Sequence, residues 1–160
     1  MVPVIRRAVP ADCAALTQMR LDFVRESHPH RVVSAEFAAA TRRFFEERLG
    51  TSEPVAFWLV EADGQVIAHA ALILFQKLPN LSNLSGREGY VSNVLTLAAH
   101  RRRGVAAALL EAVTADARER GIGRLWLYTS ADGEPLYARA GFERAASGAA
   151  PMMELLLNEG

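Results

Sequence analysis

Three consecutive arginines, Arg101, Arg102 and Arg103, are followed directly by Gly104 and a run of small and apolar residues. The pattern before them predicts a strand over residues 90–97, and the pattern after them predicts a helix from about residue 103 to 120. A helix start carries unpaired backbone N–H groups and the positive end of the helix dipole. No Ser, Thr, Asp or Asn stands immediately before this helix to cap those groups. The arrangement predicts a site for a phosphate or pyrophosphate.

A second interpretation of the arginines has to be weighed, because charged residues at a helix start are usually a solvated turn. Positive side chains are normally favoured at the other end of a helix. A bound polyanion would offset this unfavourable arrangement of charge. Gly104 adds to the case, since the absence of a Cβ lets a ligand approach the backbone closely.

Residues 101–106 resemble the Arg/Gln-x-x-Gly-x-Gly/Ala signature of the GNAT (Gcn5-related N-acetyltransferase) superfamily. The strand segment 90–97 precedes this signature, as in the family. Residues 133–142 are similar to the family's Leu-Tyr-x-x-x-Gly-Phe segment and contain Leu136, Tyr137, Gly141 and Phe142. The three blocks stand in the family's order and spacing, and the resemblance covers residues 4–157.

The resemblance implies acetyl-coenzyme A (acetyl-CoA) as cosubstrate, with its pyrophosphate held at the helix start and its pantetheine arm along the strand before it. The strand would offer its backbone to the pantetheine in place of a neighbouring strand. Ser130 and Asp132 would either bind the cofactor or cap the following helix, which suits Asp132 best. The expected cofactor-binding residues are Val94, Leu95, Thr96, Leu97, Arg101, Arg102, Arg103, Gly104, Val105, Ala106, Ala107, Ser130 and Asp132.

Tyr137 is the candidate general acid, as the matching tyrosine is in many family members. A phenol with a pKa of about 10 stays protonated at neutral pH and can donate to a thiolate whose conjugate acid has a pKa of about 8.5. The alternative is that Tyr137 only packs against the sheet. The resemblance also implies that a backbone N–H near Val94 or Leu95 stabilises the oxyanion.

The general base is harder to identify. Glu88 stands at the start of the central strand, where family members often carry a carboxylate, but it also fits a solvated loop charge. His69, Asp22 and Glu26 are the other candidates, although His69 alternates with apolar residues and fits a core histidine. An α-amine, with a pKa of about 7.7–8.0, needs less help from a base than a lysine amine at about 10.4.

Composition restricts the class of protein. The 160 residues are expected to form one domain over 1–160. Lys+Arg and Asp+Glu both number 18, so the net charge is zero, which argues against a general nucleic-acid binder. Cys13 is the single cysteine, which excludes an intramolecular disulfide and a cysteine-based metal site. No apolar run approaches the ~20 residues that span a membrane. We expect a cytoplasmic protein without a bound metal.

The pattern predicts an α+β fold in which antiparallel hairpins precede a β-α-β unit. The resemblance implies a mixed, mostly antiparallel sheet with splayed central strands and flanking helices, the splayed strands being 90–97 and 125–129. The expected strands are 2–7, 55–62, 65–76, 89–97, 125–129, 142–145 and 152–157. The expected helices are 10–27, 34–49, 103–120 and 134–140.

These features predict an acetyl-CoA-dependent N-acetyltransferase that acts on a primary amine of a small molecule or peptide by direct attack in a ternary complex. The resemblance assigns substrate specificity to residues 23–34 and 77–88, and suggests a homodimer. The missing base keeps an alternative open, a non-catalytic CoA-binding or sensing module on the same fold.

Overall fold

The computed structural model describes residues 3–51 and 53–145. The strands of this part are β1 (Val4–Arg7), β2 (Val55–Ala62), β3 (Gln65–Gln76), β4 (Arg87–Thr96) and β5 (Arg124–Trp126). Its α-helices are α1 (Cys13–Ser27), α2 (Ala35–Arg48), α3 (Val105–Glu119) and α4 (Glu134–Arg139). Two short 3-10 turns, η1 (Pro10–Asp12) and η2 (Ala98–His100), precede α1 and α3.

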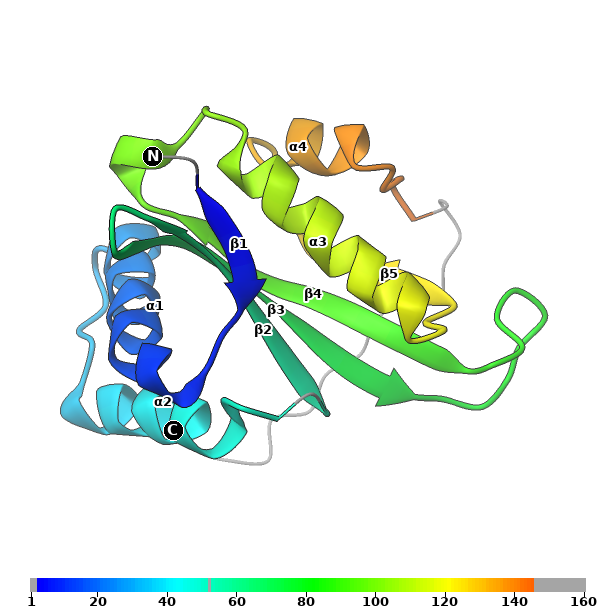
Figure 1. Cartoon of the computed structure of the whole chain (residues 1–160), viewed down its shortest axis with the longest axis horizontal. Coiled ribbons are helices and arrows are strands. Elements are labelled where there is room, and N and C mark those ends of the chain that lie inside the picture. Colours follow the sequence, from blue (N-terminus) through cyan, green and yellow to red (C-terminus); the bar gives the residue numbers. More distant parts are fainter. Residues whose placement is uncertain (1–2, 52, 146–160) are drawn as a thin grey trace.

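The strands form one sheet in the order β1-β2-β3-β4-β5. The first four strands pair antiparallel with their neighbours, and β4 pairs parallel with β5. Helix α3 makes the crossover that a parallel pair requires. The predicted α+β fold with a mixed, mostly antiparallel sheet is therefore confirmed. Figure 1 shows α1 and α2 beside one face of the sheet, and α3 and α4 on the other side.

Alternate residues of β2 point into two separate cores, as the two-residue period of a strand requires. Val55, Phe57 and Leu59 face Leu16 of α1 and Phe45 of α2. Ala56 and Val60 face the other side, where they pack with the apolar stripe of α3, which consists of Leu109, Leu110, Val113 and Ala117. The sheet is thus held between two helical layers, and β4 lies between β3 and β5 within it.

Two local structures follow from residues that are neighbours in the sequence. Ser34 caps α2, because its Oγ accepts a hydrogen bond from the N–H of Phe37 at 3.1 Å. Asp63 and Gly64 connect β2 and β3 with φ angles of 52° and 76°. Two successive positive φ angles are typical of the type I′ hairpin turn that an Asp-Gly pair predicts.

Strands β4 and β5 stay together for only three pairs: Glu88 with Arg124, Gly89 with Leu125, and Tyr90 with Trp126. A Cβ built on Gly89 would lie 2.7 Å from side-chain atoms of Leu72 and Leu125. The glycine therefore allows these strands to pack closely at their paired end. Beyond Tyr90, β4 continues to Thr96 while β5 ends at Trp126. The predicted splay thus begins after the Tyr90–Trp126 pair.

A β-bulge interrupts β4 just beyond this point. Ser92 pairs with Ala71 and Leu95 pairs with His69, so two residues of β4, Asn93 and Val94, lie opposite one residue of β3. Asn93 has a φ of 50°, in the left-handed region. A bulge leaves part of the strand's backbone outside the ladder and re-aims the side chains beside it.

Two strand predictions need correction. The strand expected over 125–129 is shorter, because the residues after Trp126 leave β4 and have no ladder there. Residues 142–145 were expected to form a strand but do not. There the chain turns back on α4 instead: the N–H of Phe142 donates to the carbonyl of Tyr137 at 3.0 Å, and Arg144 pairs with Glu134. The strand expected over 152–157 lies outside the described residues.

Candidate active site

The start of α3 is built around Gly104, which has a φ of 78° and stands at the N-cap position. Glycine has no side chain to cap the helix, and its carbonyl already accepts the N–H of Ala108 at 3.0 Å. A Cβ built on Gly104 would meet nothing within 4 Å, so the space in front of it is open. The N–H groups of the first helical turn therefore face a space that an anion can enter.

The three arginines before this glycine do not act together. Nε of Arg101 donates to the carbonyl of Thr96 at 3.0 Å, and its two terminal nitrogens bind the carboxylate of Glu26, both at 2.8 Å. This contact lowers the pKa of Glu26. Arg102 and Arg103 are exposed at the turn. Arg101 thus connects the loop before α3 to the end of α1, while its two neighbours remain beside the helix start.

A cavity of about 640 Å³ lies next to this contact, between α1, the end of β4 and the loop after β5. It brings together the four strand residues predicted to bind the cofactor with Arg101, Ser130 and Asp132. The complete lining is Met19, Asp22, Phe23, Glu26, Ser27, Val94, Leu95, Thr96, Leu97, Ala98, Arg101, Ser130 and Asp132. Residues more than 30 positions apart in the sequence therefore meet where the strands diverge.

No side chain caps α4, whose N-cap position is Gly133, so the cap predicted for Asp132 does not form. Ser130 instead holds the turn before this helix. Its Oγ accepts a hydrogen bond from the N–H of Gly133 at 3.3 Å, and its carbonyl accepts that of Glu134 at 3.1 Å. Asp132 is exposed in the same loop and lines the cavity.

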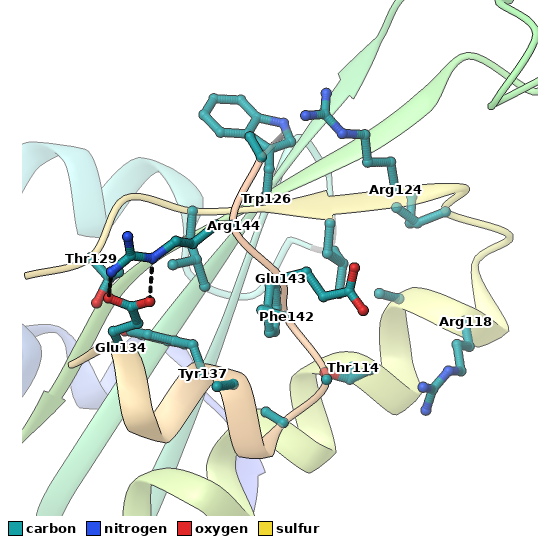
Figure 2. A pocket seen from close by; sticks show the side chains of 18 of the residues that line it. Thr114, Arg118, Arg124, Trp126, Thr129, Glu134, Tyr137, Phe142, Glu143 and Arg144 are labelled. Carbon is teal, nitrogen blue, oxygen red and sulfur yellow. Dashed lines mark hydrogen bonds and ion pairs between the residues drawn. The ribbon is translucent and has the colours of Figure 1, made fainter. Parts of the chain in front are cut away.

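Tyr137 lies on α4 and lines a second cavity, of about 1010 Å³, between α3, α4 and β5. Figure 2 shows it near Phe142, with Glu134 and Arg144 paired at the same end of the cavity. The Tyr137 and Phe142 rings meet edge to face, with centroids 6.0 Å apart. Burial, and next the nearby phenol of Tyr90, raise the pKa of Tyr137 above its usual value of 10.0. Tyr137 therefore remains a proton donor throughout the neutral range.

Tyr90 of β4 stacks on Trp126 of β5, with ring centroids 4.5 Å apart. Three residues further along β4, Oδ1 of Asn93 in the bulge accepts a hydrogen bond from Arg20 of α1 at 3.0 Å. No sequence motif indicates Arg20 or Tyr90, because α1 must first pack against β4 before Arg20 approaches this strand.

Glu88, the predicted base, lies at the other end of β4, among its paired residues. Its side chain is 3% exposed and forms ion pairs with Lys77 at 2.8 Å and Arg124 at 3.4 Å. Burial alone would raise its pKa, but the two cations outweigh burial and lower it. Glu88 lines neither cavity. These contacts favour a structural role, because a paired carboxylate with a lowered pKa is a poor proton acceptor.

The other candidate bases are either buried or paired with cationic side chains. His69 is fully buried, and burial, followed by the charge of Arg20, lowers its pKa to about 4. Its two ring nitrogens have no hydrogen-bond partner among the described residues. Oδ1 of Asp22 accepts hydrogen bonds from Gln18 and Arg25, both at 2.8 Å. Glu26 is paired with Arg101. No candidate base from the sequence is therefore an unpaired, exposed acceptor.

In the described part of the chain there is no cluster of three or more His, Cys, Asp or Glu side chains arranged to hold a metal ion. The helices of residues 3–51 and 53–145 also include none with the length and apolar character needed to cross a membrane.

Two solved structures resemble this chain over nearly its full length. A predicted acetyltransferase from Clostridium acetobutylicum, solved with acetyl-CoA, is 25% identical with a TM-score of 0.81, covering 99% of this chain and 100% of that one. A GCN5-related N-acetyltransferase from Ralstonia eutropha JMP134 is 28% identical with a TM-score of 0.75, covering 94% of this chain and 99% of that one.

Glucosamine-6-phosphate N-acetyltransferase from Arabidopsis thaliana shares the fold at 15% identity, with a TM-score of 0.72 and coverage of 96% of this chain and 100% of that one. No curated protein matches the chain significantly. The sequence model of the acetyltransferase (GNAT) family matches residues 16–142, which include α1, the diverging strands, α3 and α4. The chain is therefore a member of the GNAT acetyltransferase family.

Proposed function

We propose that this protein transfers the acetyl group of acetyl-CoA to a primary amine of a small molecule or peptide, by direct attack in a ternary complex. The observation that carries the proposal is the divergence of β4 from β5 after the Tyr90–Trp126 pair. Among the described residues, the divergence leaves one edge of β4 without a neighbouring strand, beside a cavity lined by Val94, Leu95, Thr96 and Leu97. The uncapped start of α3 follows directly after this strand.

The cofactor fits these elements in two parts. Its pyrophosphate would lie on the N–H groups of residues 104–107, with Arg102 and Arg103 adding positive charge. Its pantetheine arm would follow the open edge of β4, where strand backbone offers hydrogen bonds to an amide-containing chain. Arg101 would also bind the pyrophosphate, after its ion pair with Glu26 has broken. Exposed ion pairs contribute only about 0–1 kcal/mol, so breaking this pair costs little.

Acetyl transfer requires that the C–N bond form while the C–S bond breaks. The thioester carbonyl would lie at the bulge, where a backbone N–H near Val94 or Leu95 is available for the oxygen that becomes negative. The amine loses one proton and the departing thiolate gains one. Tyr137 would supply the thiolate's proton, which its raised pKa allows at neutral pH. The proton from the amine would pass to solvent, since Asp22, Glu26 and Glu88 are all engaged by cations.

One observation supports a second candidate, a CoA-binding module that does not acetylate. Glu88, Glu26 and Asp22 are all engaged by cations, and His69 is enclosed. The experiment that separates the two candidates measures acetyl-CoA binding and thiol release in the presence of a panel of amines. Binding together with amine-dependent thiol release supports the acetyltransferase. Binding without release for any amine favours the module.

A further inference from the structure

Arg20 has no carboxylate partner among the described residues, unlike two other half-buried arginines near the sheet. Arg6 pairs with Asp12 at 2.8 Å, and Arg7 pairs with Asp116 at 3.2 Å. Arg20 is half-buried too, but within the described residues it contacts only the neutral amide oxygen of Asn93, at 3.0 Å, and the ring of Phe23, 5.6 Å away. A guanidinium always carries its charge and offers five donors. A half-buried cation without a carboxylate partner is a binding group for an anion.

The location of Arg20 connects this cation to the proposed chemistry. Asn93, its hydrogen-bond partner, is a residue of the bulge in β4. Tyr90 lies three residues before Asn93 on the same strand. The guanidinium therefore lies beside the bulge, where the thioester carbonyl is expected, and an anion on Arg20 would be close to the reacting amine.

A cluster of aromatic residues begins three residues before Asn93 on β4 and continues on β5 and the loop after it. Tyr90 and Trp126 are stacked with their centroids 4.5 Å apart and their planes at 25°. Tyr128 meets both rings edge-on, 6.1 Å from Tyr90 and 5.9 Å from Trp126. Tyr128 is 69% exposed, so this aromatic group reaches solvent. Such a surface favours stacking or edge contacts with another planar ring.

The neighbouring carboxylates do not neutralise Arg20. Asp22 is paired with Arg25, and Glu26 is paired with Arg101, both at 2.8 Å. Glu88 is paired with Lys77 and Arg124 at the paired end of β4. Asp132 is exposed in the loop after β5. A polycationic acceptor would meet the charge of Arg20 directly beside the reaction centre, whereas an acceptor with a carboxylate would be attracted to it.

We propose that the acceptor is an amine that carries a carboxylate close to the amine and an aromatic side chain, the chemistry of an aromatic α-amino acid. This inference rests on the proposed function. The carboxylate would bind Arg20, and the ring would lie against Tyr90, Trp126 and Tyr128. The amine would then point to the bulge. The carboxylate of a free amino acid raises the pKa of its own amine, and a guanidinium bound to that carboxylate offsets the effect and favours the neutral amine.

The test compares phenylalanine with phenethylamine, which lacks the carboxylate, and with alanine, which lacks the ring. We expect kcat/KM for phenylalanine to exceed that for either compound by at least ~10-fold. Arg20→Gln should raise the KM for phenylalanine about 10- to 100-fold more than the KM for phenethylamine. Arg20→Lys should restore part of the loss. Arg42→Gln is the control, because Arg42 lies on α2 and already pairs with Glu46.

A direct binding measurement separates this inference from the proposed function. Phenylalanine is titrated calorimetrically into protein saturated with CoA, for the original chain and for Arg20→Gln. Binding that depends on Arg20, without turnover of any amine, would support the carboxylate site and contradict the acetyltransferase. Turnover of phenethylamine equal to that of phenylalanine, unaffected by Arg20→Gln, would overturn the carboxylate site and support the acetyltransferase. Absence of both binding and turnover would overturn both.

Discussion

Tyr90 of β4 and Trp126 of β5 are the last residues at which these two parallel strands pair, and their rings are stacked 4.5 Å apart. Beyond this pair, the edge of β4 faces a cavity instead of a strand. Arg20 of α1 binds Asn93, three residues beyond Tyr90, and Tyr137 lies on α4, on the opposite side of the sheet (Figure 1). One interruption of the sheet thus provides both the proposed cofactor channel and the proposed acceptor site.

Replacing Tyr137 with Phe removes the proposed proton donor and keeps the ring that packs on Phe142. We expect kcat to fall about 10²- to 10⁴-fold. The dissociation constant for acetyl-CoA and the midpoint of thermal unfolding should stay the same. In the original chain, the loss of kcat from deprotonation of Tyr137 should occur at a higher pH than for an ordinary phenol, since burial raises its pKa. Unchanged kcat in the variant would remove Tyr137 from the mechanism.

Glu88→Gln separates a structural carboxylate from a base. The substitution weakens buried contacts with Lys77 and Arg124, so the free energy of unfolding should fall by about 1–3 kcal/mol. Urea denaturation at pH 7 measures this loss. Because the folded pKa of Glu88 is lowered, its contribution is present above pH 4.5 and is lost as the pH falls through the folded value. A kcat within twofold of the original supports this role, and a fall of 100-fold or more would make Glu88 the base.

His69 should make stability depend on pH. Its pKa is about 4 in the folded protein and 6.5 when unfolded, so the unfolded state binds more protons between these values. Stability should therefore fall by about 2 kcal/mol from pH 7 to pH 5, out of about 3 kcal/mol in all. Urea denaturation at the two pH values measures the difference. His69→Leu should remove most of it, and the same difference in that variant would show that another group is responsible.

Glu26→Gln tests whether the ion pair competes with the cofactor. The substitution releases Arg101 from its two 2.8 Å contacts. We expect acetyl-CoA to bind about 2- to 5-fold more tightly at low salt, because an exposed pair contributes about 0–1 kcal/mol. The gain should disappear in the Glu26→Gln/Arg101→Gln double variant, measured calorimetrically. Weaker binding in the single variant would mean that the ion pair shapes the cavity.

Elements defined by neighbouring residues could be predicted from the sequence. The Ser34 cap and the Asp63-Gly64 turn depend on local geometry, and β2 and β3 have their expected bounds. The strand expected at 142–145 was wrong because strand formation needs a partner. Phe142 and Arg144 instead contact α4.

In the candidate site, too, residues in a continuous motif could be predicted, whereas contacts between distant residues could not. The residues before and at the start of α3 form a continuous motif, which is why the sequence indicates them. Arg20 and Asn93 are 73 positions apart and Glu26 and Arg101 are 75 apart, and packing of α1 brings each pair together. Neither contact follows from spacing or composition. The sequence suggested Glu88 as a base because it does not reveal the contacts with Lys77 and Arg124, which approach Glu88 only in the folded sheet.

The central claim is that the open start of α3 holds acetyl-CoA, and two glycines of the same helix allow a matched test. Gly104 precedes α3 and Gly121 follows it; both have positive φ angles, and a Cβ on either meets nothing within 4 Å. Both Gly→Glu variants should therefore lose similar stability from backbone strain, about 1–2 kcal/mol.

The decisive measurement is calorimetric titration of acetyl-CoA into the original chain, Gly104→Glu and Gly121→Glu. The original chain and Gly121→Glu should bind with similar affinity, and Gly104→Glu should bind at least ~100-fold more weakly, because its carboxylate enters the space for the pyrophosphate. Absence of binding to the original chain, or equal binding by all three, would contradict the account.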